Sequence, residues 1–206
     1  MINAKKQELL QRGNAFFPIQ YYLSNTANPL YNLPLHWHFE MELIHIVKGS
    51  YTMFVDNSEK ILHENDMCLI TGGILHGDGK KIGKCLYESV VFDPEMIRIK
   101  NYSADDFISQ IVDRKVYMED VIPSDNGEMY SKVNELFTMM RKKPDGYELF
   151  TTGILFEIMG ILKSEKMYYE KSLVPTGKKI RSEQLKAVLD FIQEKYSEQL
   201  TLEQMA

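Results

Sequence analysis

The spacing of apolar and polar positions changes once along this chain, near residue 100. Before that point, short runs rich in aromatic and β-branched residues are separated by turn-forming Gly, Asn, Asp and Pro. These runs cover residues 16–23, 51–55, 60–62, 67–70 and 84–92. Short strands separated by regular turns are typical of a sandwich or closed barrel, and not of alternating strands and helices. We therefore expect β structure that ends near Asp93 and Pro94.

Beyond Tyr102 the apolar period changes from two to that of a helix. A short helix is predicted from residues 103–106, and a longer one from a cap at residues 124–126. The longer helix carries an apolar stripe that something must cover. The stripe consists of Met129, Val133, Leu136, Phe137 and Met140.

A third helix is predicted at about residues 148–165, and it is apolar over most of its circumference. Such a helix is buried on more than one side. One interpretation is that it packs on the barrel and on a second copy of the protein, which makes it a dimerisation helix. The alternative is a fully internal helix. The residues predicted for dimerisation are Leu149, Ile154, Leu155, Ile158, Ile161 and Leu162.

The last forty residues lose and then regain helical periodicity. Residues 167–181 contain Pro175, Gly177 and several basic residues, a composition typical of a linker. A helix is predicted from Ser182 to about Ser197, and another begins at Thr201. Because a helix of two turns is unstable without partners, we expect the chain to be truncated within this unit.

Candidate chemistry is concentrated between residues 36 and 49. His36 and His38 are two positions apart, so both imidazoles lie on one face of an extended chain. Glu42 has the same parity, but an unbent strand would place it about 13 Å beyond His38. The backbone must therefore turn near residues 39–41 if the three side chains are to converge.

The spacing of these residues is similar to the first cupin motif, with His36, His38, Glu42 and Gly49 at its positions. The spacing of Asn65, Thr71, Gly73 and His76 is similar to the second cupin motif. This chain departs from that motif at three positions, because Asn65 replaces a usual glycine, Thr71 a usual proline, and Lys80 a usual asparagine. The resemblance implies an α+β chain, with a cupin-like antiparallel β-barrel (jelly roll) followed by an antiparallel helical pair.

Three imidazoles and one carboxylate suit a divalent metal ion such as zinc, nickel, manganese or iron. His36, His38, Glu42 and His76 are therefore candidate metal ligands. The alternative is a polar pocket in which the same four residues bind an organic effector without metal. We expect no cofactor to be required.

The tail from residue 180 onward resembles the opening of the DNA-binding region of AraC-type transcription regulators, in which a cupin sensor precedes two helix-turn-helix units. The resemblance implies an effector-binding barrel with an N-terminal arm at residues 1–100, a helical dimerisation unit at 101–166, the linker, and a truncated helix-turn-helix domain at 182–206. It further implies a small polar effector, most often a sugar or related metabolite, and a homodimer. Promoter DNA would be bound by the full-length protein and not by this chain alone.

Composition limits these interpretations only slightly. The net charge of -5 gives no general attraction to nucleic acid. Two cysteines, Cys68 and Cys85, lie in apolar runs and are expected to be reduced. The absence of a leader-like or membrane-spanning run leads us to expect a cytoplasmic protein. No nucleophile motif is present, so we expect a non-enzyme, with a cupin metalloenzyme of isomerase or dioxygenase type as the alternative.

Overall fold

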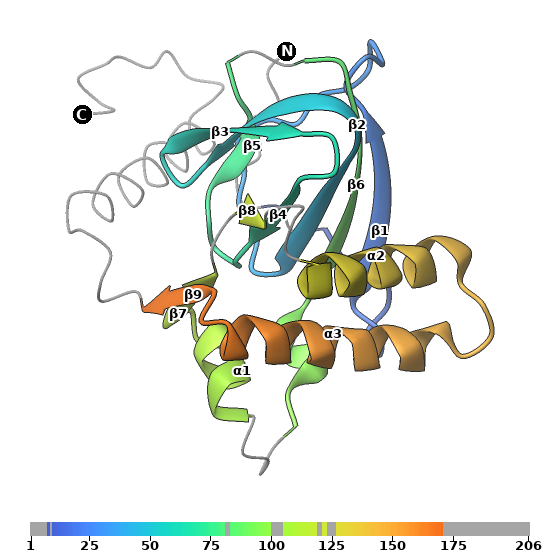
Figure 1. Ribbon diagram of the computed structural model, residues 1–206, viewed down its shortest axis with the longest axis vertical. Coiled ribbons are helices and arrows are strands. Elements are labelled where there is room, and N and C mark those ends of the chain that lie inside the picture. Colours follow the sequence, from blue (N-terminus) through green and yellow to red (C-terminus); the bar gives the residue numbers. More distant parts are fainter. Residues whose placement is uncertain are drawn as a thin grey trace, which may run out of the picture.

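The chain folds as a curved antiparallel sheet with a pair of helices packed beneath it (Figure 1). The computed structural model describes residues 8, 10–80, 83–99, 105–118, 121–122 and 127–170. The elements in chain order are β1 (Ile19–Asn25), β2 (Met41–Val55), β3 (Ser58–His63), β4 (Met67–Ile70), β5 (His76–Asp78), β6 (Cys85–Phe92), the 3-10 helix η1 (Pro94–Ile97), α1 (Asp105–Val112), β7 (Val116–Met118), β8 (Val121–Ile122), α2 (Gly127–Lys142), α3 (Tyr147–Ser164) and β9 (Tyr168–Glu170).

The long strand β2 organises the sheet. Its first half pairs with β4 and β6, and its second half pairs with β3 and β5. A register shift between Ile46 and Lys48 precedes Gly49, whose φ of 88° favours glycine. A Cβ at Gly49 would lie 2.2 Å from the Lys84 carbonyl oxygen, so no larger residue fits there. This bend lets one strand contribute to both walls of a cupin-like fold.

The fold class predicted from the sequence is confirmed, with one difference in detail. The main sheet runs in the order β1-β6-β2-β4-β8, so in the described residues it has two ends and is not a closed barrel. Asn65 occupies the left-handed region with a φ of 71°, which asparagine tolerates better than most residues. This conformation explains how an asparagine can replace the usual glycine of the second motif.

Side chains alternate between the two faces of the sheet. Met41 and Leu43 of β2, with Val90 and Phe92 of β6, face the helices and belong to the larger apolar core. Ile44 and Ile46 point into the barrel, where they join a separate core with Tyr51, Met53, Leu62 and Cys68. On β6, and on β2 before its register shift, a residue's parity therefore decides whether it faces the barrel interior or the helices.

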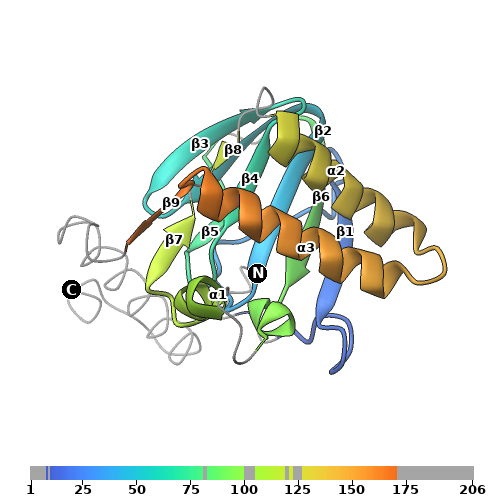
Figure 2. The ribbon, with the colours of Figure 1, turned by 60° about the horizontal axis from the view of Figure 1, so that its bottom comes forward.

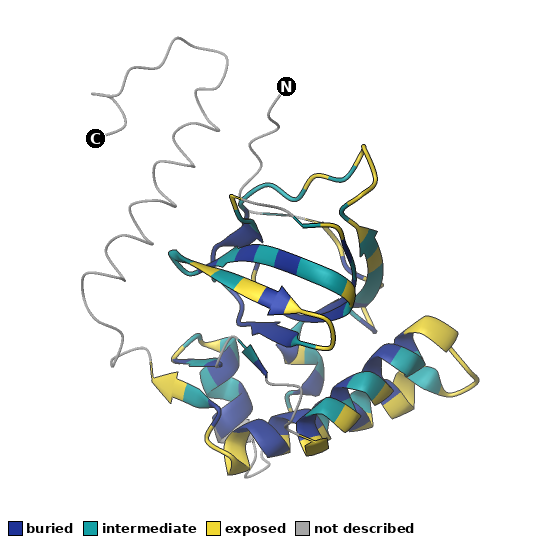
Figure 3. Ribbon diagram, turned by 45° about the horizontal axis from the view of Figure 1, so that its top comes forward, coloured by how far each residue is buried: buried dark blue, intermediate teal, exposed yellow. Residues whose placement is uncertain are grey.

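Helices α2 and α3 lie side by side across one face of the sheet (Figure 2). The predicted stripe on α2 is buried as expected. On α3, five of the six residues predicted for dimerisation are buried within this chain, and only Leu149, at 81% exposure, is on the surface. A side chain covered by its own chain cannot contact a partner directly, so Ile154, Leu155, Ile158, Ile161 and Leu162 act as core residues here. Exposed positions concentrate at the start of α3 (Figure 3).

Three further predictions need correction. β structure does not end at Pro94, because β7, β8 and β9 follow it. The predicted linker begins within an ordered element, since β9 pairs with β7. The polar composition of residues 1–15 predicts a loose arm, but this arm is partly fixed, because the backbone N–H of Glu8 donates to the Trp37 carbonyl oxygen at 2.9 Å and Arg12 is buried.

Several sequence predictions lie outside the described residues. These are the first two residues of the short helix predicted from 103–106, the cap at 124–126, the rest of the linker from residue 171, and the helix-turn-helix start at 182–206. Both cysteines are buried and neither forms a disulfide, as expected. In the described part of the chain, no helix is both long and apolar enough to span a lipid bilayer.

Candidate functional site

The four candidate side chains come together at one end of β2. His36 and His38 precede β2, the chain bends at residues 39–40, and Glu42 follows within the strand. His36 and His76 form a β-bridge in which each backbone N–H donates to the other residue's carbonyl oxygen at 2.9 Å. The bend that the sequence required between His38 and Glu42 is therefore present.

Two glycines hold this bend in place. The Gly73 N–H donates to the His38 carbonyl oxygen at 2.6 Å. A Cβ at Gly72 would lie only 2.0 Å from the Phe39 carbonyl oxygen. The two backbone segments can therefore approach this closely only because position 72 is a glycine. The turn after β4 thus positions the histidine segment before β2.

The histidine rings form a compact buried cluster. Ring centroids are separated by 4.3 Å for His36 and His76, 4.9 Å for His38 and His76, and 5.6 Å for His36 and His38. One nitrogen from each ring lies within 4.8 Å of the others. Glu42 Oε2 is 3.2 Å from His76 Nε2 and 3.5 Å from His38 Nε2. The structure therefore brings together all four residues that the sequence singled out.

The tautomer of each histidine follows from its backbone contacts. Nδ1 of His36 lies 2.9 Å from the Pro34 carbonyl oxygen, Nδ1 of His38 lies 3.1 Å from that of Glu40, and Nδ1 of His76 lies 2.8 Å from that of Ile74. A carbonyl oxygen can only accept, so each Nδ1 carries the hydrogen. In each neutral ring, the lone pair is therefore on Nε2.

The charges in the cluster differ between its members. Burial, and then the neighbouring His76, lower the pKa of His36 to about 4, so this ring is neutral near pH 7. Burial acts to lower the pKa of His38, but the Glu42 carboxylate outweighs it and raises that pKa. Although burial disfavours ionisation of Glu42, His38 and His76 hold its pKa well below the usual range. Glu42 is therefore a buried carboxylate stabilised by its histidine neighbours.

This donor set fits a divalent metal ion. Nε2 of His38 and Nε2 of His76 are buried, and their contacts with Glu42 Oε2, at 3.5 Å and 3.2 Å, lack the geometry of a hydrogen bond. Orientation of a ligating imidazole by a backbone carbonyl at its other nitrogen is the usual supporting arrangement in metal sites. His36, His38 and His76 can thus supply three nitrogen ligands, with the Glu42 carboxylate beside them.

A pocket of about 150 Å³ opens next to His36 and Glu42. Its wall comes from β1, β2, β6, the N-terminal arm and the segment between β1 and β2. The lining residues are Glu8, Leu10, Arg12, Tyr22, Ser24, Leu33, His36, Glu42, Tyr87, Ser89 and Val91. His38 and His76 do not line it, so the histidine cluster lies at one side of the pocket.

Sequence reasoning missed most of this wall. Tyr22 pairs with Ser89, and Ser24 with Tyr87, across the β1–β6 ladder. Strand parity would have placed these four residues on one face once that pairing was known. Glu8 and Arg12 carried no such signal, because the arm has no strand or helix pattern.

On the opposite face of the same strands, Glu88 of β6 is the centre of a second buried polar cluster. Its carboxylate accepts hydrogen bonds from Tyr21 Oη at 3.0 Å and Arg141 Nη1 at 2.9 Å. The carboxylate also lies 3.0 Å from His45 Nδ1. Tyr21, His45 and Arg141 come from β1, β2 and α2, so this cluster ties the back of the pocket's sheet to a helix.

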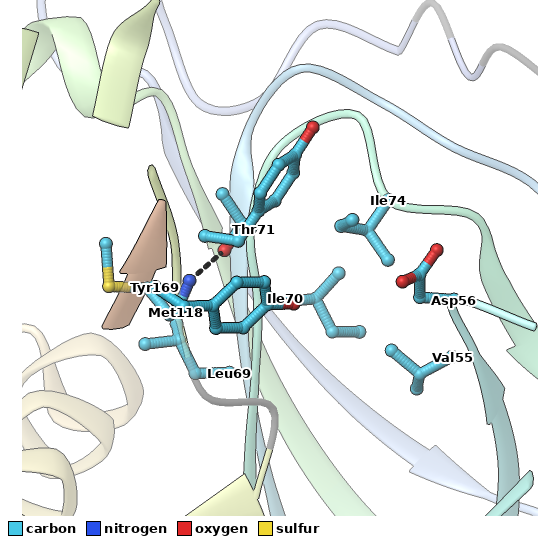
Figure 4. Close-up of a pocket in the computed structure, with 9 residues that line it drawn as sticks. Val55, Asp56, Leu69, Ile70, Thr71, Ile74, Met118 and Tyr169 are labelled. Atoms are coloured by element: carbon cyan, nitrogen blue, oxygen red, sulfur yellow. Dashed lines mark hydrogen bonds between the residues drawn. The ribbon is translucent and has the colours of Figure 1, made fainter. Parts of the chain in front are cut away.

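A third feature links the turn after β4 to the β7–β9 ribbon. The backbone N–H of Met118 donates to the buried Thr71 Oγ1 at 2.9 Å, beside a small cavity of about 10 Å³ (Figure 4). Such a cavity has room for about one water molecule. Thr71 is the residue that replaces the usual proline of the second motif. Its hydroxyl supplies an acceptor that proline lacks.

Comparisons with known proteins place this geometry in context. No protein-family model matches the chain. Among solved structures, an RmlC-like cupin from Shewanella frigidimarina aligns at a TM-score of 0.31 and 18% identity, over 35% of this chain and 65% of that one. ToxT from Vibrio cholerae aligns at a TM-score of 0.44 and 8% identity, over 91% of this chain and 69% of that one.

The sequence match to a curated protein is more extensive. The whole chain aligns with the uncharacterized HTH-type transcriptional regulator YdeC of Bacillus subtilis, at 26% identity over 226 aligned positions and 71% of that protein's length. This chain is a homologue of a transcriptional regulator. The relationship recognised from the sequence is therefore confirmed at the level of an HTH-type regulator, and the structure adds the cupin-like sheet with its helical pair.

Proposed function

We propose that this regulator homologue is the effector-sensing and dimerisation part of an AraC-like transcription regulator. The observation that carries the proposal is a buried cluster of three histidines and one carboxylate beside a pocket, in a chain homologous to an HTH-type regulator. A small polar molecule, such as a sugar or related metabolite, would bind in the pocket. Promoter DNA would be bound by a helix-turn-helix domain of the full-length protein.

His36, His38, His76 and Glu42 would hold a divalent cation at this site. Bound there, the cation would supply a Lewis acid that holds an oxygen atom of the effector. The chain's own residues orient the site through the three Nδ1 contacts and exclude water by burial. A cupin metalloenzyme would use the same ligands, so turnover of a bound molecule is what separates the two functions.

The β4–β5 turn offers a route by which the pocket can influence the following domain. Gly73 contacts the carbonyl oxygen of His38, and Thr71 in the same turn accepts the Met118 N–H. Met118 of β7 pairs with Tyr168 of β9. Movement of His38 would therefore be passed through the Gly73 and Thr71 contacts and the β7–β9 pairing to the strand that leads into the C-terminal part of the chain.

Dimerisation would use the exposed start of α3. Leu149 is 81% exposed and Phe150 is 60% exposed, although both are large apolar residues. Phe16, at 98% exposure, lines the same surface hollow as Thr152 of α3. Coverage by a second copy would remove this apolar surface from water. This patch, defined by Phe16, Leu149 and Phe150, replaces the buried positions first predicted.

Metal analysis tests the site directly. Protein purified without added metal or a metal-chelating tag should contain close to one divalent ion per chain, and His76→Ala should lose it. His63→Ala is the matched control, because His63 is exposed and lies outside the cluster. A wild-type metal content near zero, with no thermal stabilisation by added zinc, would remove the metal from the proposal.

A second assay separates sensing from catalysis. A thermal-shift screen of sugars and related metabolites should find a molecule that stabilises the protein and is recovered unchanged. That molecule should also alter the affinity of the full-length protein for its promoter fragment. Chemical conversion of the bound molecule, without any effect on DNA binding, would favour the metalloenzyme.

A further inference from the structure

Arg12 is an unusual residue to find in the wall of the pocket. It comes from the N-terminal arm, yet it is only 6% exposed. Its Nη1 donates to Tyr22 Oη at 2.5 Å, and its Nη2 pairs with Glu8 Oε2. A buried guanidinium needs a nearby anion, because an unpaired charge in this environment is costly. Glu8 is the carboxylate that supplies it.

Glu8 satisfies Arg12 incompletely. Arg12 Nε is buried and has no hydrogen-bond partner among the described residues. A guanidinium presents paired donors that match both oxygens of a carboxylate, and the arrangement with two parallel bonds is the stronger one. The backbone N–H of Glu8 is meanwhile bound to the Trp37 carbonyl oxygen. Glu8 is thus a tethered carboxylate that leaves one donor of Arg12 unused.

The same carboxylate lies beside the histidine cluster. Glu8 Oε2 is 3.7 Å from His36 Nε2, the nitrogen that carries the free lone pair. Arg12 therefore holds one carboxylate at the edge of the pocket, with Tyr22 against the guanidinium and His36 beside the carboxylate. The other pocket carboxylate, Glu42, lies against His38 and His76 and not against Arg12.

We propose that the effector carries a carboxylate group, which replaces the Glu8 side chain as the anionic partner of Arg12. Glu8 then acts as an internal stand-in that occupies the ligand's position in the effector-free protein. The untethered carboxylate can bond both Nε and an Nη of Arg12, and the rest of a small hydroxy or oxo acid lies in the pocket. This proposal rests on the proposed sensing function and specifies its ligand class.

The proposal can be tested without knowledge of the natural effector. The test removes the Glu8 carboxylate by substitution and supplies a small carboxylate from solution. Glu8→Ala should lower the thermal midpoint by about 3 °C, because Arg12 loses its anion. Acetate at 50 mM should restore most of this loss, and acetamide, which has the same shape and no charge, should restore none. Wild-type protein and Glu64→Ala, which removes an exposed carboxylate elsewhere, should not respond to acetate.

A second measurement uses malate and its uncharged diamide as probes. Calorimetry should show binding of malate and not of the diamide, and Glu8→Ala should bind malate about tenfold more tightly, because the internal competitor is gone. The double variant with Arg12→Gln should lose both the acetate response and malate binding. Equal responses to acetate and acetamide, or equal malate affinities in wild-type protein and Glu8→Ala, would overturn the proposal.

These outcomes are separate from those of the sensing function. If the carboxylate proposal fails, the expected metal content of the histidine cluster and the search for a neutral effector are unaffected. Loss of the sensing function would instead appear as chemical conversion of the bound molecule with no effect on DNA binding, whatever the response to acetate.

Discussion

The contact between Arg141 and Glu88 is expected to contribute measurably to stability. Arg141→Met removes the guanidinium while it keeps most of the apolar stem. Glu88 is 2% exposed and would retain the contacts of its carboxylate with Tyr21 and His45. The variant therefore tests whether the connection from the sheet to α2 depends on this pair.

The magnitude follows from burial. Removing one partner of a fully buried ion pair costs about 3–5 kcal/mol, and removing one from an exposed pair costs about 0.2–1 kcal/mol. The Arg141 side chain is 50% exposed and its partner is 3% exposed, so the pair lies between these limits. We expect a loss of about 1.5 kcal/mol, which corresponds to a lower thermal midpoint by about 3–6 °C.

The dependence on pH has a defined sign. Burial opposes ionisation of Glu88, but hydrogen bonds from His45 and Tyr21 outweigh it and lower the pKa. A carboxyl whose pKa is lower in the folded state stabilises the protein above its unfolded value of about 4.3. That contribution is lost as the pH falls through the lowered folded value. Acidification below about pH 5 should therefore destabilise wild-type protein more steeply than Glu88→Gln.

Urea unfolding of a double-mutant cycle measures the pair. The four proteins are wild type, Arg141→Met, Glu88→Gln and the double variant, and their coupling energy should be about 1 kcal/mol. Lys142→Met is the control, because Lys142 is the neighbouring exposed cation of α2. A loss in Arg141→Met no larger than in Lys142→Met, or a coupling energy below about 0.3 kcal/mol, would refute the reasoning.

Three other variants test separate features. Thr71→Val leaves the buried Met118 N–H without its acceptor and should cost about 1–3 kcal/mol in urea unfolding; an unchanged midpoint would contradict the contact. Gly72→Ala forces apart the backbones of Gly72 and Phe39, so zinc titration should show at least tenfold weaker binding, and unaltered binding would count against this role for the turn. Leu149→Glu places a charge on the exposed apolar patch and should shift sedimentation toward monomer; Glu148→Lys, next to it, is the charge-change control, and an equal effect of both would argue against the patch.

The candidate site was predictable because its signals are local. The spacing of His36, His38 and Glu42 set the parity, and the distance argument required a bend that the structure has at residues 39–40. His76 could be added from the second motif. The helical pair was also predictable, because α2 and α3 carry long apolar patterns.

The elements that sequence reasoning missed depend on long-range contacts. β7 and β9 are three residues each, too short for an apolar period, and each is stabilised by the other across about fifty residues of chain. The position of Arg12 in the pocket wall likewise depends on Tyr22 and Glu8 and not on its own neighbours in sequence. The sequence could not show whether α3 is buried by its own chain or by a second copy, because an apolar pattern does not identify what covers it.

The pairing of β7 with β9 has a topological consequence for α2 and α3. The ribbon joins the chain before α2 to the chain after α3, so both helices lie in a closed loop of one polypeptide. Exchange of the α2–α3 hairpin between two molecules would first require the β7–β9 ribbon to open. The loop would then have to close again, and the conformational entropy lost on closing so long a loop opposes this step. Association of two copies is therefore expected to occur by surface docking and not by domain swapping.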